Sequence, residues 1–325
     1  MRTLDALILD NAPTADTWII VDDPTGSLLE AATGRVISLQ SDFSQAQAAR
    51  AAGAEVIGDV RYDERLSGSG TAVVVGQMPK SLERLDYVAR AVAAAGFDEV
   101  TVVLSANNKH LSRGMNDVLA RSFTDVRASR GRGKFRCLVA SGPKPGEYEP
   151  VVRGGLVGVG GVFSGAKEDF GGQLLAEVIV DKCNQPQRVL DLGCGNGSVA
   201  KRVLEAWPQT QVVATDSDAD AVVSARASLA GFGDRAEVTW DDAGAQLEPG
   251  FDVIALNPPF HEGTSVDATL IQDLLDGAAR LLADGGELFV VHNSHLRYRD
   301  QVQQRFARVE EVARNKRYTV LSARA

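Results

Sequence analysis

The sequence has little cysteine, and the three cysteines it has are far apart. Cys137, Cys183 and Cys194 form no Cys-x-x-Cys pair and show none of the spacings of a zinc site. A disulfide framework and a structural zinc site built on cysteine are therefore not expected. We predict that the chain holds no metal and works in a reducing, cytoplasmic environment.

Long apolar runs are also missing. No stretch is long and apolar enough to cross a bilayer. The first residues, MRTLDALILD, lack the order of a signal peptide, in which basic residues precede an apolar segment. We therefore expect neither a membrane segment nor a secretory signal.

Positive charge is scarce overall, because 34 Lys and Arg residues face 43 Asp and Glu residues and give a net charge of −9. This balance argues weakly against a nucleic-acid partner, but a local patch can act independently of the net charge. One such patch is present, since the segment RASRGRGKFR contains no acidic residue. Its cations are Arg127, Arg130, Arg132, Lys134 and Arg136.

The length and the hydrophobic pattern indicate two domains. A chain of 325 residues suggests two domains at a usual size of about 150 residues. From residue 187 onward, short β-rich runs alternate with amphipathic helical stretches, which predicts a parallel, doubly wound sheet. The last two β-rich runs are separated only by a short basic turn at 315–317. That turn is too short for a parallel crossover, so we predict an antiparallel hairpin.

The first half of the chain repeats the pattern of the second. Residues 108–138 and 293–321 both run Asn-x-His-Leu, a helix ending in Phe, a strand, a basic turn and a closing strand. The segment 141–150 has the Pro and Gly content of a linker. We predict an α/β protein with two tandem, doubly wound Rossmann-like domains, residues 1–142 and 143–325, each ending in an antiparallel hairpin.

Only the second half carries the residues of a cofactor site. Its glycine-rich segment DLGCGNG (191–197) corresponds to VDDPTGS (21–27), which lacks the alternating glycines. Asp216 of the second half corresponds to Gln40 of the first. We therefore expect the N-terminal domain to be a degenerate copy and the C-terminal domain to be the catalytic one.

The glycine-rich segment predicts a cofactor site, because it follows a strand and opens a helix. Asp191 precedes the glycines, where a carboxylate can hold the amino-acid end of a ligand but would repel a pyrophosphate. Asp216 ends the second strand and can accept hydrogen bonds from both ribose hydroxyls, and Asp242 can bond an adenine amino group. A ribose, an adenine and a cationic centre together indicate S-adenosylmethionine. Taken singly, Asp216 and Asp242 fit helix-capping or turn residues equally well.

A second motif, Asn257-Pro258-Pro259-Phe260, follows a strand-like apolar run. Ligands of open α/β sheets bind outside the carboxyl ends of the strands, so this motif is expected to face the methyl donor. We predict that the Asn257 side-chain oxygen and the Pro258 carbonyl each accept one hydrogen of a planar amine. Phe260 would stack on a planar base. The alternative interpretation is a strand ended by a Pro-Pro turn.

Four segments together resemble a known family. GGVFSGAKEDFGGQLL (160–175), VLDLGCGNG (189–197), ALNPPFHEG (255–263) and residues 285–321 look like the bacterial ribosomal RNA guanine-N2 methyltransferases. The resemblance covers the whole chain and implies a degenerate methyltransferase domain followed by an active one that uses S-adenosylmethionine. The C-terminal segment is closer to the large-subunit (23S) type than to the small-subunit (16S) type.

The resemblance also implies roles for individual residues. Phe163, Ser164 and Asp169 would help to enclose the cofactor. The complete set of implied cofactor-binding residues is Phe163, Ser164, Asp169, Asp191, Gly193, Gly195, Asp216, Asp242 and Asn257. Residues Asn257, Pro258, Pro259 and Phe260 would hold the base. One departure is Glu168, which stands where the family usually has Leu and which bears on the packing of that loop.

The substrate that the resemblance implies is ribosomal RNA, and we expect the protein to act as a monomer. A guanine inside structured RNA must be turned out of the stack, at a cost of a few kcal/mol. We expect the degenerate domain to supply contacts to the RNA backbone, with Arg130, Arg132 and Lys134 as phosphate ligands. His261 is a further candidate RNA contact, although it fits an ordinary polar loop residue equally well.

Other functions stay open on the sequence. Motifs of the Asn-Pro-Pro type also serve methylation of a protein glutamine amide or of adenine N6, because each is a planar amine. In a nicotinamide-dependent oxidoreductase, the glycine loop would bind the cofactor and the Asn-Pro-Pro-Phe motif would only form a turn. A non-catalytic RNA-binding protein is a third possibility, which the intact motifs from Asp191 to Phe260 argue against.

Overall fold

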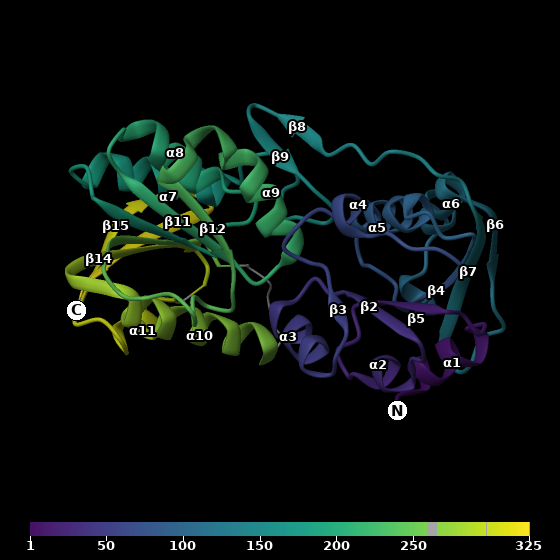
Figure 1. The fold of residues 1–325 in the computed structure, drawn as a ribbon. Coiled ribbons are helices and arrows are strands. Elements are labelled where there is room, and N and C mark those ends of the chain that lie inside the picture. Colours follow the sequence, from purple (N-terminus) through teal and green to yellow (C-terminus); the bar gives the residue numbers. More distant parts are fainter. Residues whose placement is uncertain (259–264, 297, 325) are drawn as a thin grey trace. The chain divides into compact units, whose positions relative to one another are not determined.

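The computed structural model describes residues 1–258, 265–296 and 298–324, and its ribbon is drawn in Figure 1. The chain divides into two compact units. Unit 1 consists of Met1–Pro150 with Val159–Gly161, and unit 2 consists of Val151–Gly158 with Val162–Ala325.

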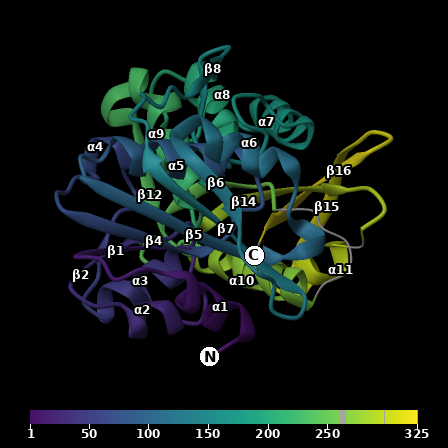
Figure 2. The same cartoon turned by 90° about the vertical axis from the view of Figure 1, so that its right-hand side faces the viewer.

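Unit 1 is a seven-stranded sheet in the order β3-β2-β1-β4-β5-β7-β6. Its strands are β1 (Thr17–Val21), β2 (Arg35–Leu39), β3 (Glu55–Val56), β4 (Thr71–Gln77), β5 (Glu99–Asn107), β6 (Phe123–Ala128) and β7 (Phe135–Pro143). Its helices are α1 (Thr3–Asn11), α2 (Ser27–Ala31), α3 (Phe43–Ala51), α4 (Tyr62–Arg65), α5 (Leu82–Ala94), η1 (Asn108–His110) and α6 (Arg113–Ser122). The helices α1 to α3 cover one face of the sheet, and α4 to α6 cover the other (Figure 2).

Unit 2 repeats this order as β12-β11-β10-β13-β14-β16-β15. Its sheet strands are β10 (Arg188–Leu192), β11 (Gln211–Asp216), β12 (Ala236–Trp240), β13 (Phe251–Leu256), β14 (Leu282–Asn293), β15 (Arg308–Arg314) and β16 (Tyr318–Arg324), and a separate small hairpin pairs β8 (Val151–Arg153) with β9 (Leu156–Gly158). Its helices are α7 (Phe170–Lys182), α8 (Ser198–Ala206), α9 (Ala219–Leu229), η2 (Ala230–Arg235), α10 (Ser265–Leu281) and α11 (Tyr298–Gln303). Helices α7 to α9 lie on one face of the sheet, and α10 and α11 lie on the other (Figure 1).

Each sheet ends in the predicted antiparallel hairpin. In unit 2, β16 runs antiparallel to both β14 and β15, and in unit 1, β7 runs antiparallel to both β5 and β6. The remaining neighbours in both sheets are parallel. The predicted fold class, a repeated doubly wound α/β architecture, is therefore confirmed.

The strands of unit 2 read as continuous apolar runs because both faces of the sheet are covered. Successive residues of β10 point to opposite faces, so Val189 packs under α7 to α9 while Leu190 packs against α10. Helix α10 meets the sheet through a stripe with helical spacing. That stripe consists of Ile271, Leu274, Leu275, Ala278 and Leu281, all buried.

The observed division between the units follows Pro150, whereas the sequence predicts a boundary after residue 142. The segment expected to be a linker packs on unit 1 instead. The ring of Tyr148 lies 4.5 Å from that of Tyr87, and the Arg61 guanidinium donates to the Tyr148 carbonyl at 3.0 Å. Pro and Gly content signals an irregular path for the chain, but it does not reveal that an aromatic residue within that path is anchored.

Candidate active site

The three glycines of the loop between β10 and α8 have different tasks. Gly193, Gly195 and Gly197 have φ angles of 78°, 54° and 79°, a region that L side chains rarely adopt. A Cβ atom built on Gly193 or Gly195 would meet no atom within 4 Å, so both face open space. A Cβ on Gly197 would lie 3.3 Å from Cβ of Ala225 in α9. The first two glycines therefore leave room for a ligand, and the third lets α8 approach α9.

Two predicted acids, Asp191 and Asp216, brace this loop. Oδ2 of Asp191 accepts a hydrogen bond from the backbone N–H of Ala200 in α8 at 3.0 Å. Oδ2 of Asp216 accepts from the N–H of Gly195 at 2.9 Å, and its Oδ1 accepts from the N–H of Asp218 at 2.9 Å. Asp216 is thus a turn residue as well as a candidate ribose ligand, because a carboxylate oxygen can accept more than one hydrogen bond.

Burial makes both carboxylates unusually basic. Burial, opposed by the Ala200 hydrogen bond and aided by the nearby charge of Asp216, raises the pKa of Asp191 to about 7. Burial also raises the pKa of Asp216, against the backbone hydrogen bonds that it accepts. A cation bound beside these groups would lower their pKa values again by stabilising the ionised form. The pair therefore favours a ligand that carries positive charge.

The turn after β12 is built by an acid that the sequence interpretation missed. Asp241 is buried, and its two oxygens accept hydrogen bonds from the N–H groups of Asp242 and Gln246, each at 2.8 Å. The predicted adenine ligand, Asp242, is half-buried, and its own carbonyl accepts from Ala245 at 2.9 Å. The adjacent acids Asp241 and Asp242 were the available signal in the sequence.

The segment expected to enclose the cofactor is fastened to the glycine loop by Asn196. The side-chain Nδ2 of this buried residue donates to the carbonyls of Gly165 at 2.7 Å and Lys167 at 2.8 Å. Within the fastened segment, Ser164 has a φ of 62° and the Phe163 side chain is 62% exposed. An exposed aromatic residue at this position is available to cover a ligand. The role of Asn196 was not predicted, because this residue stands inside the glycine motif and was read only as part of it.

The departure from the family pattern at Glu168 has a local explanation. Its carboxylate accepts two hydrogen bonds from the Arg202 guanidinium of α8, at 3.0 and 2.7 Å. The acidic residue thus ties the segment to α8 through an ion pair, where a leucine would rely on apolar contact.

Asn257, at the end of β13, has its amide held in a specific orientation. Nδ2 donates to Oδ2 of Asp169 at 3.0 Å, while the buried Oδ1 has no hydrogen-bond partner in the described part of the chain. Asp169 also caps α7, accepting from the N–H of Gly172 at 3.0 Å. A Cβ on Gly171 would lie 3.4 Å from Oδ1, and one on Gly172 would lie 3.3 Å from Nδ2. The two glycines therefore provide the space that the amide occupies.

The rest of the predicted base-holding motif is described only in part. Pro258 is buried directly after Asn257. The predicted residues Pro259, Phe260 and His261 lie outside the described residues. The site that the structure brings together therefore consists of the glycine loop, its acids, the 163–169 segment and Asn257.

Unit 1 has the same strand order as unit 2, but different side chains occupy the place of the cofactor site. Gln40 stands at the place of Asp216, and its Oε1 accepts from the N–H of Asp23 at 3.1 Å, as Asp216 accepts from Gly195. The neighbouring Asp22 forms an ion pair with Arg84 of α5 at 3.4 Å. In unit 1, side chains thus bond to one another at the place where unit 2 has glycines that face open space.

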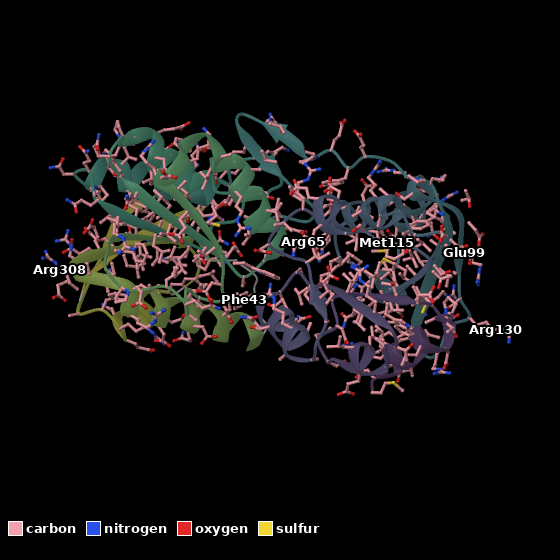
Figure 3. The ribbon with its side chains drawn as sticks, in the orientation of Figure 1. Phe43, Arg65, Glu99, Met115, Arg130 and Arg308 are labelled. Carbon is pink, nitrogen blue, oxygen red and sulfur yellow. The ribbon has the colours of Figure 1, made fainter. Side chains whose placement is uncertain are left out.

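The basic segment between β6 and β7 lies at the surface. Arg130 and Lys134 are exposed, and Figure 3 shows Arg130 at the outer edge of unit 1. Arg132 is instead paired with Asp10. The structure therefore brings the three predicted phosphate ligands onto one turn, with one of them partly neutralised.

Two further expectations concern metals and membranes. Within residues 1–258, 265–296 and 298–324, the structure contains no cluster of three His, Cys, Asp or Glu side chains that could hold a metal ion. No helix in the described part of the chain has the length and apolar character that a bilayer crossing requires.

The doubly wound sheet, the glycine loop braced by acids and the asparagine at the end of the fourth strand define a class I methyltransferase. Residues 154–322 match the family model described as methyltransferase small domain, and residues 4–144 match the RLMG N-terminal domain. The chain belongs to the family of the ribosomal RNA large subunit methyltransferases G, which confirms the resemblance seen in the motifs.

The similarity to individual members covers nearly the whole chain. The ribosomal RNA large subunit methyltransferase G of Alcanivorax borkumensis is 30% identical over 332 residues, covering 96% of this chain and 85% of that protein. The protein of the same name from Pseudomonas entomophila is 30% identical over 336 residues, covering 96% and 89%. The ribosomal RNA small subunit methyltransferase C of Haemophilus influenzae is 36% identical over 164 residues, which is 50% of this chain and 49% of that protein.

Both units together have the fold of a solved structure. The T. thermophilus 16S rRNA N2 G1207 methyltransferase, in complex with AdoMet and guanosine, superposes with a TM-score of 0.79 at 22% identity. The superposition covers 99% of this chain and 92% of that one, so the two-unit architecture is shared from end to end.

Proposed function

We propose that this protein transfers the methyl group of S-adenosylmethionine to the exocyclic N2 amine of a guanine in the large-subunit (23S) ribosomal RNA. The choice of subunit rests on coverage. The relatives similar over 96% of the chain are named for the large subunit, whereas the small-subunit relative from Haemophilus influenzae matches half of it.

The observation that carries the reaction is that Oδ1 of Asn257 has no hydrogen-bond partner among the residues that the structure describes. A buried polar atom without a hydrogen bond costs about 1–3 kcal/mol, so such an atom at a sheet edge points to a ligand. An acceptor oxygen there suits a donor such as an amine. The guanine N2 amine offers two hydrogens, and its lone pair is delocalised into the ring.

The residues present fit S-adenosylmethionine, which when bound supplies an electrophilic methyl group. Asp191 would hold the ammonium end and Asp216 the ribose hydroxyls, while Asp242 would bond the adenine amine. Open space at Gly193 and Gly195 lets the loop backbone approach the ligand closely. The remaining enclosing residues would be Phe163 and Ser164, on the segment that Asn196 fastens.

Catalysis by this chain would be chiefly orientation. Oδ1 of Asn257 accepts one amine hydrogen and the Pro258 carbonyl accepts the other, which directs the nitrogen lone pair towards the methyl carbon. S-adenosylmethionine, held by Asp191, Asp216 and Asp242, would supply the methyl group to this nitrogen, and the amine would then release one proton to water. Proline fixes its own φ angle and so holds its position rigidly. No strong general base is needed, because the proton leaves after a positive charge has formed on nitrogen.

Unit 1 would bind the RNA around the target. Its exposed residues Arg130 and Lys134 suit phosphate groups, and such contacts offset the cost of turning a guanine out of its stack. Arg132, predicted to act with them, would contribute once it exchanges Asp10 for a phosphate.

The test is transfer of labelled methyl to protein-free 23S and 16S RNA, followed by nucleoside analysis. The wild type should form N2-methylguanosine in 23S RNA, Asn257→Ala should form none, and Asn184→Ala, which changes an exposed asparagine after α7, should match the wild type. Label in 16S RNA alone would support the proposed reaction and contradict the assignment to the large subunit. Label in neither RNA would contradict protein-free RNA as the substrate and leave an assembled ribosomal particle and a protein glutamine amide as the next substrates to test.

A further inference from the structure

A groove next to Asn257 has no assigned role. It has a volume of about 470 Å³ and lies between the first turns of α7 and the turn that joins β15 to β16. Its lining residues are Phe170, Gln173, Leu174, Glu177, Asn315, Arg317 and Tyr318.

The groove adjoins the place where the base would be held. Gly171 is the connecting residue, because a Cβ atom on it would lie 3.3 Å from Cε1 of Tyr318 and 3.4 Å from Oδ1 of Asn257. The Tyr318 ring thus borders the groove on one side and the Asn257 amide environment on the other. The groove therefore offers a path for a chain that delivers its base to Asn257.

The turn at the edge of the groove carries two cations, Lys316 and Arg317. The side chains of Lys316 and Arg317 make no hydrogen bond or ion pair within the described residues. By contrast, Arg202, Arg305 and Arg324 of the same unit are each paired with a carboxylate. Free cations beside a binding site suit an anionic ligand.

The turn that presents these cations is well defined. Oδ1 of Asn315 accepts hydrogen bonds from the N–H groups of Arg317 at 2.9 Å and Tyr318 at 2.7 Å. The N–H of Asn315 donates to the Tyr318 carbonyl at 2.9 Å, which closes the turn. The groove wall is therefore held by backbone hydrogen bonds rather than by the cations themselves.

Two aromatic residues line the groove, Phe170 and Tyr318, and of these Phe170 is the exposed one, at 68%. A single exposed ring is common on protein surfaces, so Phe170 is informative only together with the cations beside it. An aromatic face combined with an adjacent guanidinium is the pairing that binds single-stranded nucleic acid, with a base on the ring and a phosphate on the cation. Glu177, the acidic residue in the lining, lies 4.0 Å from the Arg202 guanidinium, which it shares with Glu168.

We propose that this groove binds the nucleotide next to the target guanine in the RNA strand. The neighbouring base stacks on Phe170, the Gln173 and Asn315 amides bond its edge, and Arg317 binds the phosphate between it and the guanine. The proposal rests on the proposed function for its choice of RNA. It assigns to unit 2 a local RNA contact of its own, in addition to the exposed basic turn of unit 1.

The duplicated architecture agrees with this assignment. The β15–β16 turn of unit 2 and the β6–β7 turn of unit 1 occupy the same place in the common strand order. Both are basic, with Lys316 and Arg317 in one and Arg130 and Lys134 in the other. Unit 1 has lost its glycine loop, yet its hairpin turn has remained cationic.

The test compares Phe170→Leu and Arg317→Gln in the full-length protein. Affinity for a fluorescently labelled 23S RNA fragment and for S-adenosylmethionine is measured at several salt concentrations, together with methyl-transfer kinetics. Phe170→Leu should raise the Kd for RNA about tenfold. Arg317→Gln should reduce the slope of log affinity against log salt by about 0.7. The Kd for S-adenosylmethionine should stay unchanged in both variants.

Matched controls separate the groove from general effects. Phe170→Tyr keeps an aromatic face and should bind RNA as the wild type does. Arg314→Gln removes a cation that pairs with Glu311 at 3.4 Å, on the strand leading into the same turn, and should leave the salt slope nearly unchanged. Thermal melting of each variant establishes that it is folded.

The outcomes distinguish this proposal from the proposed function. Wild-type RNA affinity and salt slope in both groove variants would overturn the groove assignment, while loss of methylation in Asn257→Ala would still uphold the reaction. If the wild type methylates no RNA, the reaction fails, and equal RNA affinities for wild type, Phe170→Leu and Arg317→Gln would then overturn the groove as well.

Discussion

The carboxylate of Asp169 fixes the amide of Asn257, whose Nδ2 donates to Oδ2 of Asp169 at 3.0 Å. An ionised carboxylate only accepts hydrogen bonds, so it can bond the NH2 end of an amide but not its oxygen. Oδ1 of Asn257 is therefore turned away and remains unpartnered within the described residues. Asp169 was expected to enclose the cofactor, and this contact connects it to the base-holding residue.

We predict that Asp169→Asn lowers kcat roughly 10- to 100-fold with little change in stability. An asparagine retains the helix cap, because Asn is as good an N-cap residue as Asp. It can, however, donate to Oδ1 of Asn257 as well as accept from Nδ2, so the amide loses its single orientation. Steady-state kinetics with saturating S-adenosylmethionine measures the effect. Unchanged kcat would show that the orientation of Asn257 does not depend on this contact.

Gly171→Ala should lower kcat about tenfold by crowding the same amide. The added Cβ would lie 3.0 Å from Oδ2 of Asp169 and 3.4 Å from Oδ1 of Asn257, in the space through which an amine must approach. The preference of alanine over glycine in a helix, up to about 1 kcal/mol, offsets part of the cost of these tight contacts, so the loss of stability should be small. Gly114→Ala, in the first turn of α6 in unit 1, is the matched control and should keep full activity. Equal activity of the two variants would contradict the crowding argument.

Much of this architecture could be read from the sequence, because it depends on patterns local to the chain. Alternating apolar runs predicted the repeated sheet, and the short basic turn at 315–317 predicted the final hairpin. The contacts between distant segments were not predictable. Asp169 and Asn257 are 88 positions apart, and nothing local to either residue reveals their hydrogen bond. The same holds for Asn196, whose partners, the carbonyls of Gly165 and Lys167, have no side-chain signature.

Cofactor affinity should fall below neutral pH through Asp191. Its pKa in the folded protein is raised to about 7, and binding an ammonium group requires the ionised form. The Kd for S-adenosylmethionine should therefore rise about tenfold for each pH unit below 7. Asp191→Asn, which can still accept from Ala200, should bind weakly and without this pH dependence. A pH-independent Kd in the wild type would show that Asp191 does not hold the cationic end.

The same carboxyl group has the opposite effect on folding stability. A folded-state pKa above the unfolded value of 3.8 means that the folded form takes up a proton, so stability from this group is present at low pH and is lost as pH rises through 7. Relative to Asp191→Asn, the free energy of unfolding of the wild type should increase by about 2–3 kcal/mol from pH 8 to pH 5. Urea unfolding of both proteins at the two pH values measures this difference. A constant difference would exclude the raised pKa.

The chain should bind one molecule of S-adenosylmethionine, in unit 2. In unit 1, the Arg84 guanidinium pairs with Asp22 at 3.4 Å and also donates to the Tyr62 hydroxyl at 3.2 Å. These side chains bond to one another at the place where a cofactor site would need glycines facing open space. Isothermal titration should give a stoichiometry of one, and Gln40→Asp should not raise it. A second site, or a second site created by that substitution, would show that unit 1 has kept its binding capacity.

The cations in the basic turn of unit 1 should contribute unequally to RNA binding. Arg130→Gln and Lys134→Gln remove exposed cations, and each should reduce the salt dependence of RNA binding by about 0.7–0.9 in the slope of log affinity against log salt. Arg132→Gln should reduce it less, because Arg132 must first give up its ion pair with Asp10. The variant Asp10→Asn supplies the complementary test, since freeing Arg132 should steepen the slope. Equal slopes for all four variants and the wild type would mean that this turn is simply solvated, and the contacts that offset turning out the guanine would then have to come from elsewhere in the chain.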